Sequence, residues 1–391
     1  MVRSVAEVIH AVDHTVGRLR GPRRVLVELR TPVYRAVLGP VYDELRTDSN
    51  VRLFFTSEHS DRVRSLISET VLTHADVEWR RFDLYLNADP WAAARLRRCA
   101  RRLNFFHGVA GKYDLDRPSG LPMGFEYYDR VAFINQDRMA RYLAAGIVRA
   151  DQARLVGYPK LDALASGRMD PRPVLERLAL RAAMPTVLYA PTYSTASSLH
   201  LAGEAIVASL AAAGLNVMVK LHDRSLDRDP RYTGGIDWRS RMRALERPGQ
   251  IAFVEDADLT PYLAAADLMV TDHSSAGFEF LVVDRPLVIF DAPELVAAAR
   301  INPEKVDLLR SAAVLTASVE ELVATVRAEL ESPRRLSPQR RRVASEMFFD
   351  PGNATSRALE LVYELLDVDA MRASRSGHAA RSSGGSCRSP T

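Results

Sequence analysis

The segment VTDHSS, residues 270–275, places polar side chains between the end of an apolar run and the start of a helical pattern. In open α/β sheets, ligands bind beyond the carboxyl ends of strands, where loop amides and helix N-termini favour anions. Ser274 and Ser275 stand where the helix would begin, so their hydroxyls and N–H groups could bind a diphosphate, beside Thr271 and Asp272. An N-cap role for Ser274 is the simpler interpretation. The capping and phosphate-binding roles are compatible, because the backbone N–H groups that would otherwise bond to water at a helix start can bond to phosphate instead.

A second candidate is His107, which follows the apolar run LNFF and precedes Gly108. Neutral imidazole can accept a proton from an attacking hydroxyl near neutral pH, which is general-base catalysis. Gly108 and the nearby Lys112 favour a loop that faces phosphate, in which Lys112 would stabilise phosphoryl oxygens. A histidine that only bonds a carbonyl at a strand end is the alternative.

A third candidate is the pair Lys220 and His222, which flank Leu221 at the end of the run NVMVKLH. Residues two apart on a strand share a face, so we expect these two side chains to lie together. They could neutralise a diphosphate or the charge that develops on a leaving phosphate. An ion pair of Lys220 with Asp223 is the structural alternative.

Two further positions are less specific. Thr192 follows the run TVLYAP and could line a donor pocket. Asp256 and Asp258 spell a DxD pattern, which binds divalent metal in some transferases, but carboxylates at a helix start are more often a cap and a surface charge. We therefore predict that Asp258 caps the following helix and that the protein needs no metal and no cofactor.

The elements that must position these residues are short β-rich runs alternating with longer segments of helical period. Such alternation predicts parallel, doubly wound α/β sheets. The predicted strands are residues 24–29, 51–56, 83–87, 103–108, 130–135 and 153–159, then 186–191, 216–222, 251–254, 268–272, 286–291 and 312–315. Helices are predicted at 201–213, 259–266, 319–330 and 354–366.

These elements divide the chain into two Rossmann-like halves with a cleft between them. We predict an N-terminal helical segment at 1–22, an acceptor domain at 23–170 and a nucleotide-donor domain at 171–350. The proline-bearing region 166–185 would cross between the domains. A C-terminal helix within 351–370 would pack back on the first domain, and the tail 371–391, rich in Ser, Gly and Arg, should be disordered.

Composition agrees with a two-domain globular protein. The chain has 391 residues, of which 47% are hydrophobic, and it has only 2 cysteines, too few for a disulfide framework. The first residues lack the uninterrupted apolar core of a secretory signal, and no run approaches the ~18 apolar residues of a membrane span. We therefore expect a cytoplasmic protein, with no nucleic-acid partner.

Arginine clusters raise the pI to about 9.1. They could attract anionic lipid at the inner face of the membrane or a polyanionic acceptor, while a solvated surface is the alternative. The clusters are Arg18, Arg20, Arg23 and Arg24, and Arg334, Arg335, Arg340, Arg341 and Arg342.

Five segments, in order, resemble motifs of the CDP-glycerol glycerophosphotransferases of teichoic-acid and capsule assembly. NFFHGVAGK resembles the family's HGxxxK segment, LVGYPKLDAL its TGxPRxD segment, and YAPTY its YAPTW-type strand end; VKLHD is similar to its KxHP loop and VTDHSS to its ITDYSS-like loop. The matches cover residues 104–291, about half of the chain. Three positions depart from the family pattern, namely His273 for an aromatic residue, Asp223 for proline and Ser194 for arginine.

The resemblance implies a GT-B-like fold and a transferase that moves a glycerophosphate-type group from CDP-glycerol to an acceptor hydroxyl. It assigns His107 as the base, with Lys112 and His222 in catalysis and Lys220, Thr192 and the VTDHSS loop at the donor phosphates. It places Glu279 near a ribose or sugar hydroxyl. The acceptor would be a polyol phosphate or a glycan, either free or linked to lipid. A nucleotide-sugar glycosyltransferase, an isomerase resembling the UDP-N-acetylglucosamine 2-epimerases, and an inactive nucleotide-binding scaffold remain alternatives.

Overall fold

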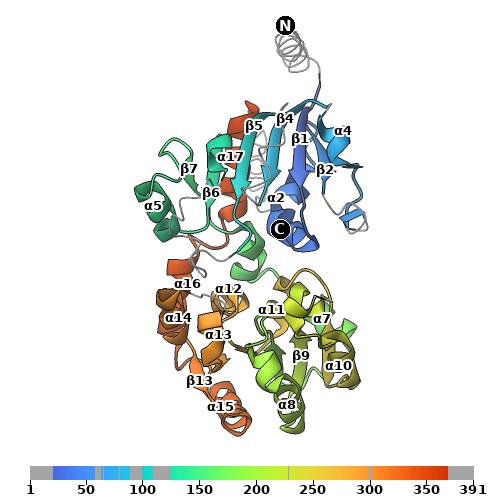
Figure 1. Ribbon diagram of the computed structural model, residues 1–391, viewed down its shortest axis with the longest axis vertical. Helices are drawn as coiled ribbons and strands as arrows, with labels where there is room; N and C mark the ends of the chain where they lie inside the picture. Colours follow the sequence, from blue (N-terminus) through green and yellow to red (C-terminus); the bar gives the residue numbers. More distant parts are fainter. Residues whose placement is uncertain are drawn as a thin grey trace, which may run out of the picture.

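The structure, a computed structural model, describes residues 21–57, 63–64, 66–78, 80–88, 99–108, 124–227, 229–298 and 302–368. Within them, two α/β units lie one above the other along the long axis of the molecule (Figure 1). Nearly all of the predicted N-terminal helical segment, Lys112 and the tail 371–391 lie outside the described residues.

The N-terminal unit is a parallel sheet in the order β3-β2-β1-β4-β5-β6-β7 among the residues described. Its strands are β1 Arg23–Glu28, β2 Val51–Thr56, β3 Val71–Leu72, β4 Phe82–Asn87, β5 Cys99–Phe105, β6 Arg130–Phe133 and β7 Ala153–Leu155. Helices α2 Pro32–Leu45, α4 His74–Glu78 and α5 Gln136–Ala144 and the 3₁₀ turn η3 Phe125–Tyr127 complete this unit.

Strands β3, β5 and β7 differ most from the sequence-based expectation, and β7 ends at Leu155, four residues earlier than predicted. The edge strand β3 has only two residues, too short to show an alternating pattern. Strand β5 begins at Cys99, earlier than predicted, because Arg101 and Arg102 interrupt the apolar pattern. Asp129, just before β6, accepts a hydrogen bond from the Arg101 side chain at 3.0 Å and from the backbone amide of Arg102 at 2.8 Å.

The C-terminal unit is a second parallel sheet, in the order β10-β9-β8-β11-β12-β13. Its strands are β8 Thr186–Tyr189, β9 Asn216–Lys220, β10 Ile251–Val254, β11 Leu268–Thr271, β12 Leu287–Phe290 and β13 Val314–Thr316. The strand order reverses between β8 and β11, and such a reversal is the position where doubly wound sheets bind ligands.

Helices cover both faces of the second sheet. Alternate residues of its strands enter two separate apolar clusters, for example Leu188 in one and Val187 with Tyr189 in the other, as the period of a strand requires. The elements are α7 Arg172–Arg177, α8 Ser198–Ala212, α9 Pro230–Thr233, α10 Trp238–Ala244, α11 Thr260–Ala265, α12 Ser275–Phe280, α13 Pro293–Ala298, α14 Pro303–Arg310 and α15 Val319–Glu331, with turns η5 Asp223–Leu226 and η6 Leu281–Val283. The predicted GT-B-like fold class is confirmed.

Two stretches join the units. The first runs from β7 through η4 Pro159–Leu161 and α6 Asp162–Ala165 to α7. The second runs from α16 Ser337–Met347 to α17 Ala354–Leu366, and α17 lies against α2, β4 and β5 of the first unit (Figure 1).

Gly157 is required where these two stretches cross. Its φ is +93°, and a Cβ placed there would lie 2.6 Å from the carbonyl oxygen of Phe349. Any larger residue would clash with the backbone that carries the chain back to the first unit.

In the second arginine cluster, four of the five arginines are exposed, and three of these lie beside a carboxylate. Arg340 is fully buried and donates to the carboxylate of Asp284 at 3.0 Å, so neither lipid nor solvent surrounds it. Arg335 pairs with Glu329, and Arg342 pairs with Glu346 at 2.8 Å. In the part of the chain that is described, no helix combines the length and apolar character needed to cross a membrane.

Candidate functional site

The carboxyl edges of the two sheets approach each other at a buried ion pair. Lys160, in η4 after β7, donates to the carboxylate of Glu279 on α12 at 2.6 Å, and each side chain is only 7% exposed. Since η4 belongs to the first unit and α12 follows β11 of the second, this contact lies between the predicted acceptor and donor halves.

His107 is exposed two residues beyond β5 and is held by a backbone carbonyl. Its Nδ1 lies 2.7 Å from the carbonyl oxygen of Ala88, which can only accept, so Nδ1 carries the proton. The Tyr34 ring stacks on the imidazole at a centroid distance of 5.0 Å. In the neutral ring the proton-accepting lone pair is therefore on Nε2, which is the arrangement a general base requires.

Buried polar side chains fix the strand end that supplies this carbonyl. Asn87, the last residue of β4, accepts hydrogen bonds at Oδ1 from Asn104 at 3.0 Å and from Tyr128 at 2.9 Å. Its Nδ2 donates to the hydroxyl of Tyr85 at 3.0 Å. Ala88 follows directly, so the imidazole of His107 is oriented by a rigid part of the sheet.

Tyr158 connects His107 with the ion pair. Its hydroxyl donates to the carbonyl oxygen of His107 at 3.1 Å. Burial raises the pKa of Tyr158 well above its ordinary value, and the charges of Glu279 and Asp258 raise it further. Tyr158 therefore stays a neutral donor that fixes the backbone of the candidate base.

Lys220, the last residue of β9, is a buried cation next to this cluster. Its ammonium donates to the carbonyl of Leu221 at 2.9 Å, rather than forming the ion pair with Asp223 that the sequence left open. Burial is the largest cause of a lowered pKa for Lys220; Asp223 raises that pKa and the nearby Lys160 lowers it. A desolvated ammonium without a contacting carboxylate is a strong attractor for phosphate.

His222 does not accompany Lys220 into the interior. It is exposed, and its ring packs on Tyr193 at a centroid distance of 4.5 Å. Its Nδ1 accepts a hydrogen bond from the amide of Arg224 at 3.1 Å, so in the neutral ring the proton is on Nε2. His222 thus presents a proton donor where His107 presents an acceptor.

The first half of the VTDHSS loop is structural in this protein. Thr271 donates through Oγ1 to the carbonyl of Ala190 at 2.6 Å. The buried carboxylate of Asp272 accepts from the amide of Thr192 at 2.9 Å and from the amide and hydroxyl of Ser198 at 3.1 and 3.0 Å. Asp272 thereby ties the loop after β11 to the loop after β8, and it holds Thr192 in a buried position.

The second half of the loop begins α12 as expected. Ser274 is the N-cap residue, and its hydroxyl accepts from the amide of Ala276 at 3.3 Å. Ser274 and Ser275 are both half-buried. His273, which stands where the family pattern has an aromatic residue, is buried. Its Nε2 lies 3.4 Å from the guanidinium of Arg310, so this side chain makes a contact inside the protein.

The two aspartates of the DxD pattern have structural partners. Asp256 pairs with Arg177 at 3.0 Å and accepts from the hydroxyl of Tyr262. Asp258 accepts from the amide and hydroxyl of Thr260 at 2.9 and 2.7 Å, although Leu259 rather than Asp258 is the N-cap residue of α11. Among the described residues, no group of three or more His, Cys, Asp or Glu side chains could hold a metal ion.

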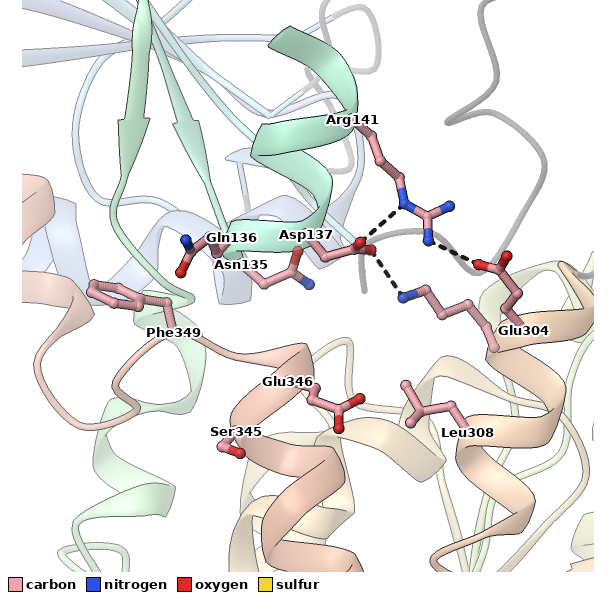
Figure 2. A pocket seen from close by; sticks show the side chains of 10 residues that line it. Asn135, Gln136, Asp137, Arg141, Glu304, Leu308, Ser345, Glu346 and Phe349 are labelled. Carbon is pink, nitrogen blue, oxygen red and sulfur yellow. Dashed lines mark hydrogen bonds and ion pairs between the residues drawn. The ribbon is translucent and has the colours of Figure 1, made fainter. Parts of the chain in front are cut away.

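A cavity of about 540 Å³ lies between the units on the side of α5 and α14 (Figure 2). Charged groups cross it: Arg141 of α5 pairs with Glu304 at 2.8 Å, and Lys305 pairs with Asp137 at 3.3 Å. Because the cations that line the cavity are already paired with carboxylates, it is less suited to an anion than the strand-end site.

Two facing Rossmann-like units with this strand-end site define a GT-B-like transferase. The model of the CDP-glycerol:poly(glycerophosphate) glycerophosphotransferase family matches residues 135–364, more than half of the chain. The chain belongs to this family and is a CDP-glycerol glycerophosphotransferase-type enzyme. The family expected from the sequence is thereby confirmed.

Solved structures show the same fold at low identity. The wall teichoic acid polymerase TagF superposes with a TM-score of 0.67 and 12% identity, over 94% of this chain and 98% of that chain. The UDP-GlcNAc 2-epimerase from Neisseria meningitidis has a TM-score of 0.57 and 11% identity, over 87% of this chain and all of the other. A search of curated proteins finds no match.

Several residues at the site were not singled out in the sequence. Tyr158 and Lys160 lie in the motif segment GYPK, where position alone could have drawn attention to them. Tyr34 and Arg224 lie outside the motif segments, and only the folded chain brings Tyr34 to His107 and Arg224 to Tyr193.

Proposed function

We propose that His107 is the general base and His222 the proton donor in transfer of glycerophosphate from CDP-glycerol to an acceptor hydroxyl. The observation that supports this assignment is the opposite placement of the ring protons. The carbonyl of Ala88 fixes the proton of His107 on Nδ1, and the amide of Arg224 fixes the proton of His222 on Nε2. One imidazole can accept a proton while the other donates one.

In this mechanism the acceptor hydroxyl attacks the phosphorus that bears glycerol. The new P–O bond forms as the bridging P–O bond breaks, and CMP leaves. The hydroxyl proton passes to Nε2 of His107, and the leaving phosphate accepts a hydrogen bond from Nε2 of His222. Catalysis is chiefly positioning and charge stabilisation, as in other phosphoryl transfers.

The cationic and hydroxyl groups would hold the donor. Lys220 and the hydroxyls of Ser274 and Ser275 would bind the diphosphate, and Lys112 would stabilise the transferring phosphoryl oxygens. Glu279 holds Lys160 through Oε2, so a ribose hydroxyl would bond to its Oε1. Thr271, Asp272 and Thr192 would act by fixing the loops after β8 and β11, since their hydrogen bonds described above are internal.

The acceptor belongs to the proposal as well. We propose a polyol-phosphate chain as acceptor, by analogy with the wall teichoic acid polymerase of the same fold. Such a chain could be linked to lipid, in which case the protein would work at the inner face of the membrane through peripheral contact. A glycan acceptor is the alternative.

The test measures nucleotide release from CDP-, UDP- and GDP-linked donors by the purified protein and its His107→Ala variant. We expect CMP release from CDP-glycerol, and a fall of about 10²–10⁴-fold in the variant, the usual contribution of a general base, with donor binding retained. His200→Ala is the matched control, because His200 contacts Trp238 at 3.1 Å in the second unit's interior.

Unchanged turnover in His107→Ala would remove the base assignment. Release only from nucleotide sugars would overturn the proposed donor, and nucleotide binding without any release would indicate a scaffold.

A further inference from the structure

Arg224 is held at the carboxyl end of β9 by aromatic side chains. It lies in η5, directly after Lys220, Leu221, His222 and Asp223. Its guanidinium carbon is 4.8 Å from the ring centroid of Tyr193 and 5.0 Å from that of Tyr232. Its Nη1 donates to the hydroxyl of Tyr193 at 2.9 Å. An otherwise flexible side chain is thus oriented before any ligand arrives.

The charge of Arg224 is not balanced by a contacting acid. Within the described part of the chain, it forms no ion pair with a carboxylate, and it is exposed. Arg231 also lies over Tyr232, at 5.6 Å, but it pairs with Asp229. An oriented arginine with free charge suits planar, bidentate binding of phosphate oxygens.

Arg224 is also linked to the proposed proton donor. Its backbone amide bonds to Nδ1 of His222, and the His222 ring packs on the same Tyr193 that the guanidinium contacts. A phosphate that meets Nε2 of His222 would therefore arrive beside the positive charge of Arg224. Substituting the Arg224 side chain leaves the backbone contact to His222 in place.

We propose that Arg224, held by Tyr193 and Tyr232, binds a phosphate group of the substrate at the carboxyl end of β9. This inference rests on the proposed function, and it adds a specificity residue to that site. The phosphate could come from two sources, the diphosphate of the donor or a phosphodiester of the acceptor chain, which share the same chemistry.

The experiment compares Arg224→Ala with Arg231→Ala by calorimetric titration with CDP and with cytidine. A charge-assisted hydrogen bond to phosphate is worth about 1.5–3 kcal/mol, so Arg224→Ala should weaken CDP binding by roughly 10- to 150-fold. Cytidine, which has no phosphate, should bind both variants equally. Arg231→Ala should match the unaltered protein with both ligands.

Steady-state kinetics separate the two sources of phosphate. If donor diphosphate is bound, the KM for CDP-glycerol rises in Arg224→Ala. If an acceptor phosphodiester is bound, CDP affinity is unchanged and only the KM for a glycerophosphate oligomer rises.

Arg224→Gln tests for a merely structural role, since glutamine can still bond to the hydroxyl of Tyr193 but has no charge. Losses equal to those of Arg224→Ala support phosphate binding. Recovery in Arg224→Gln, equal losses in Arg231→Ala, or no change in either KM would overturn the inference. Absence of CMP release from CDP-glycerol by the unaltered protein would instead count against the proposed function, and titrations with CDP and with the glycerophosphate oligomer would still decide the role of Arg224.

Discussion

Two histidines at strand ends of this protein differ in protonation because each meets a different backbone group. A carbonyl faces Nδ1 of His107, and an amide faces Nδ1 of His222. Neither ring needs a nearby carboxylate to fix its tautomer. Two residues of the same type can therefore act as base and as proton donor in one reaction, because the backbone group that faces each ring sets its tautomer.

Lys220 provides a prediction in which stability and ligand binding change in opposite directions. Lys220→Met removes a buried ammonium whose pKa is lowered chiefly by burial, so the free energy of unfolding should stay level or rise. Binding of CDP should weaken by roughly 10- to 150-fold, because a charge-assisted contact to phosphate is lost. Chemical denaturation and calorimetric titration measure the two effects.

The difference in the free energy of unfolding between the unaltered protein and the Lys220→Met variant should depend on pH. The folded-state pKa of Lys220 lies below its ordinary value of 10.5, so between those two values the unfolded chain binds more protons than the folded one. Below the folded-state pKa of Lys220, the buried charge lowers the free energy of unfolding by its full amount. This destabilisation shrinks as the pH rises towards 10.5. A variant that is less stable at neutral pH, with unchanged CDP affinity, would contradict this account.

The residues of the candidate site were predictable to different degrees. Short apolar runs followed by polar residues located the strand ends correctly, because side chains at the carboxyl edge of a parallel sheet are reached by ligands. The same pattern does not tell whether a side chain turns outward or inward. Asp272 and Thr271 follow the strand as Ser274 does, yet their side chains bond to the neighbouring loop and strand.

At the scale of elements, helix α17 depends on a carboxylate from another part of the chain. Its own N-cap residue, Asn353, makes no capping bond through its side chain. Asp162 instead accepts from the amides of Gly352, Ala354 and Thr355 at 2.9, 3.1 and 2.6 Å. The turn after β7 thereby caps the helix that returns to the first unit.

We predict that Asp162→Ala destabilises the protein by about 2–4 kcal/mol, since buried amides at a helix start lose their acceptor. The measurement is the free energy of unfolding by chemical denaturation. Asp170→Ala is the control, because Asp170 bonds only to the exposed Arg172 and should change stability by less than about 0.5 kcal/mol. Equal small effects in both variants would show that α17 does not need this cap.

At the scale of the whole molecule, the sequence indicated two α/β units but not the long-range contacts within and between them. Periodicity and turn residues are local signals, whereas the contact between Lys160 and Glu279 spans 119 positions and that between Tyr363 and Asp48 spans 315. Arg340 shows the same limit: its sequence context suggested surface, and tertiary structure buries it against Asp284.

The two units are joined by ion pairs of very different burial, which gives a prediction for their energies. Lys160 and Glu279 are each 7% exposed, whereas Arg141 and Glu304, also from opposite units, are 36% and 67% exposed. Removing one member of a buried pair leaves an uncompensated charge, so Lys160→Met and Glu279→Gln should each cost about 3–5 kcal/mol. The exposed pair should contribute no more than about 1 kcal/mol.

Double-mutant cycles of the two pairs measure these couplings. For Lys160→Met with Glu279→Gln, the double variant should lose much less than the sum of the single losses, because neither charge is then left alone in the interior. The cycle for Arg141→Ala with Glu304→Ala should give a small coupling that declines further at high salt, since exposed charges are screened. If the single substitutions at Lys160 and Glu279 prove additive, this pair does not couple the two units, and the approach of the sheet edges must depend on their apolar contacts instead.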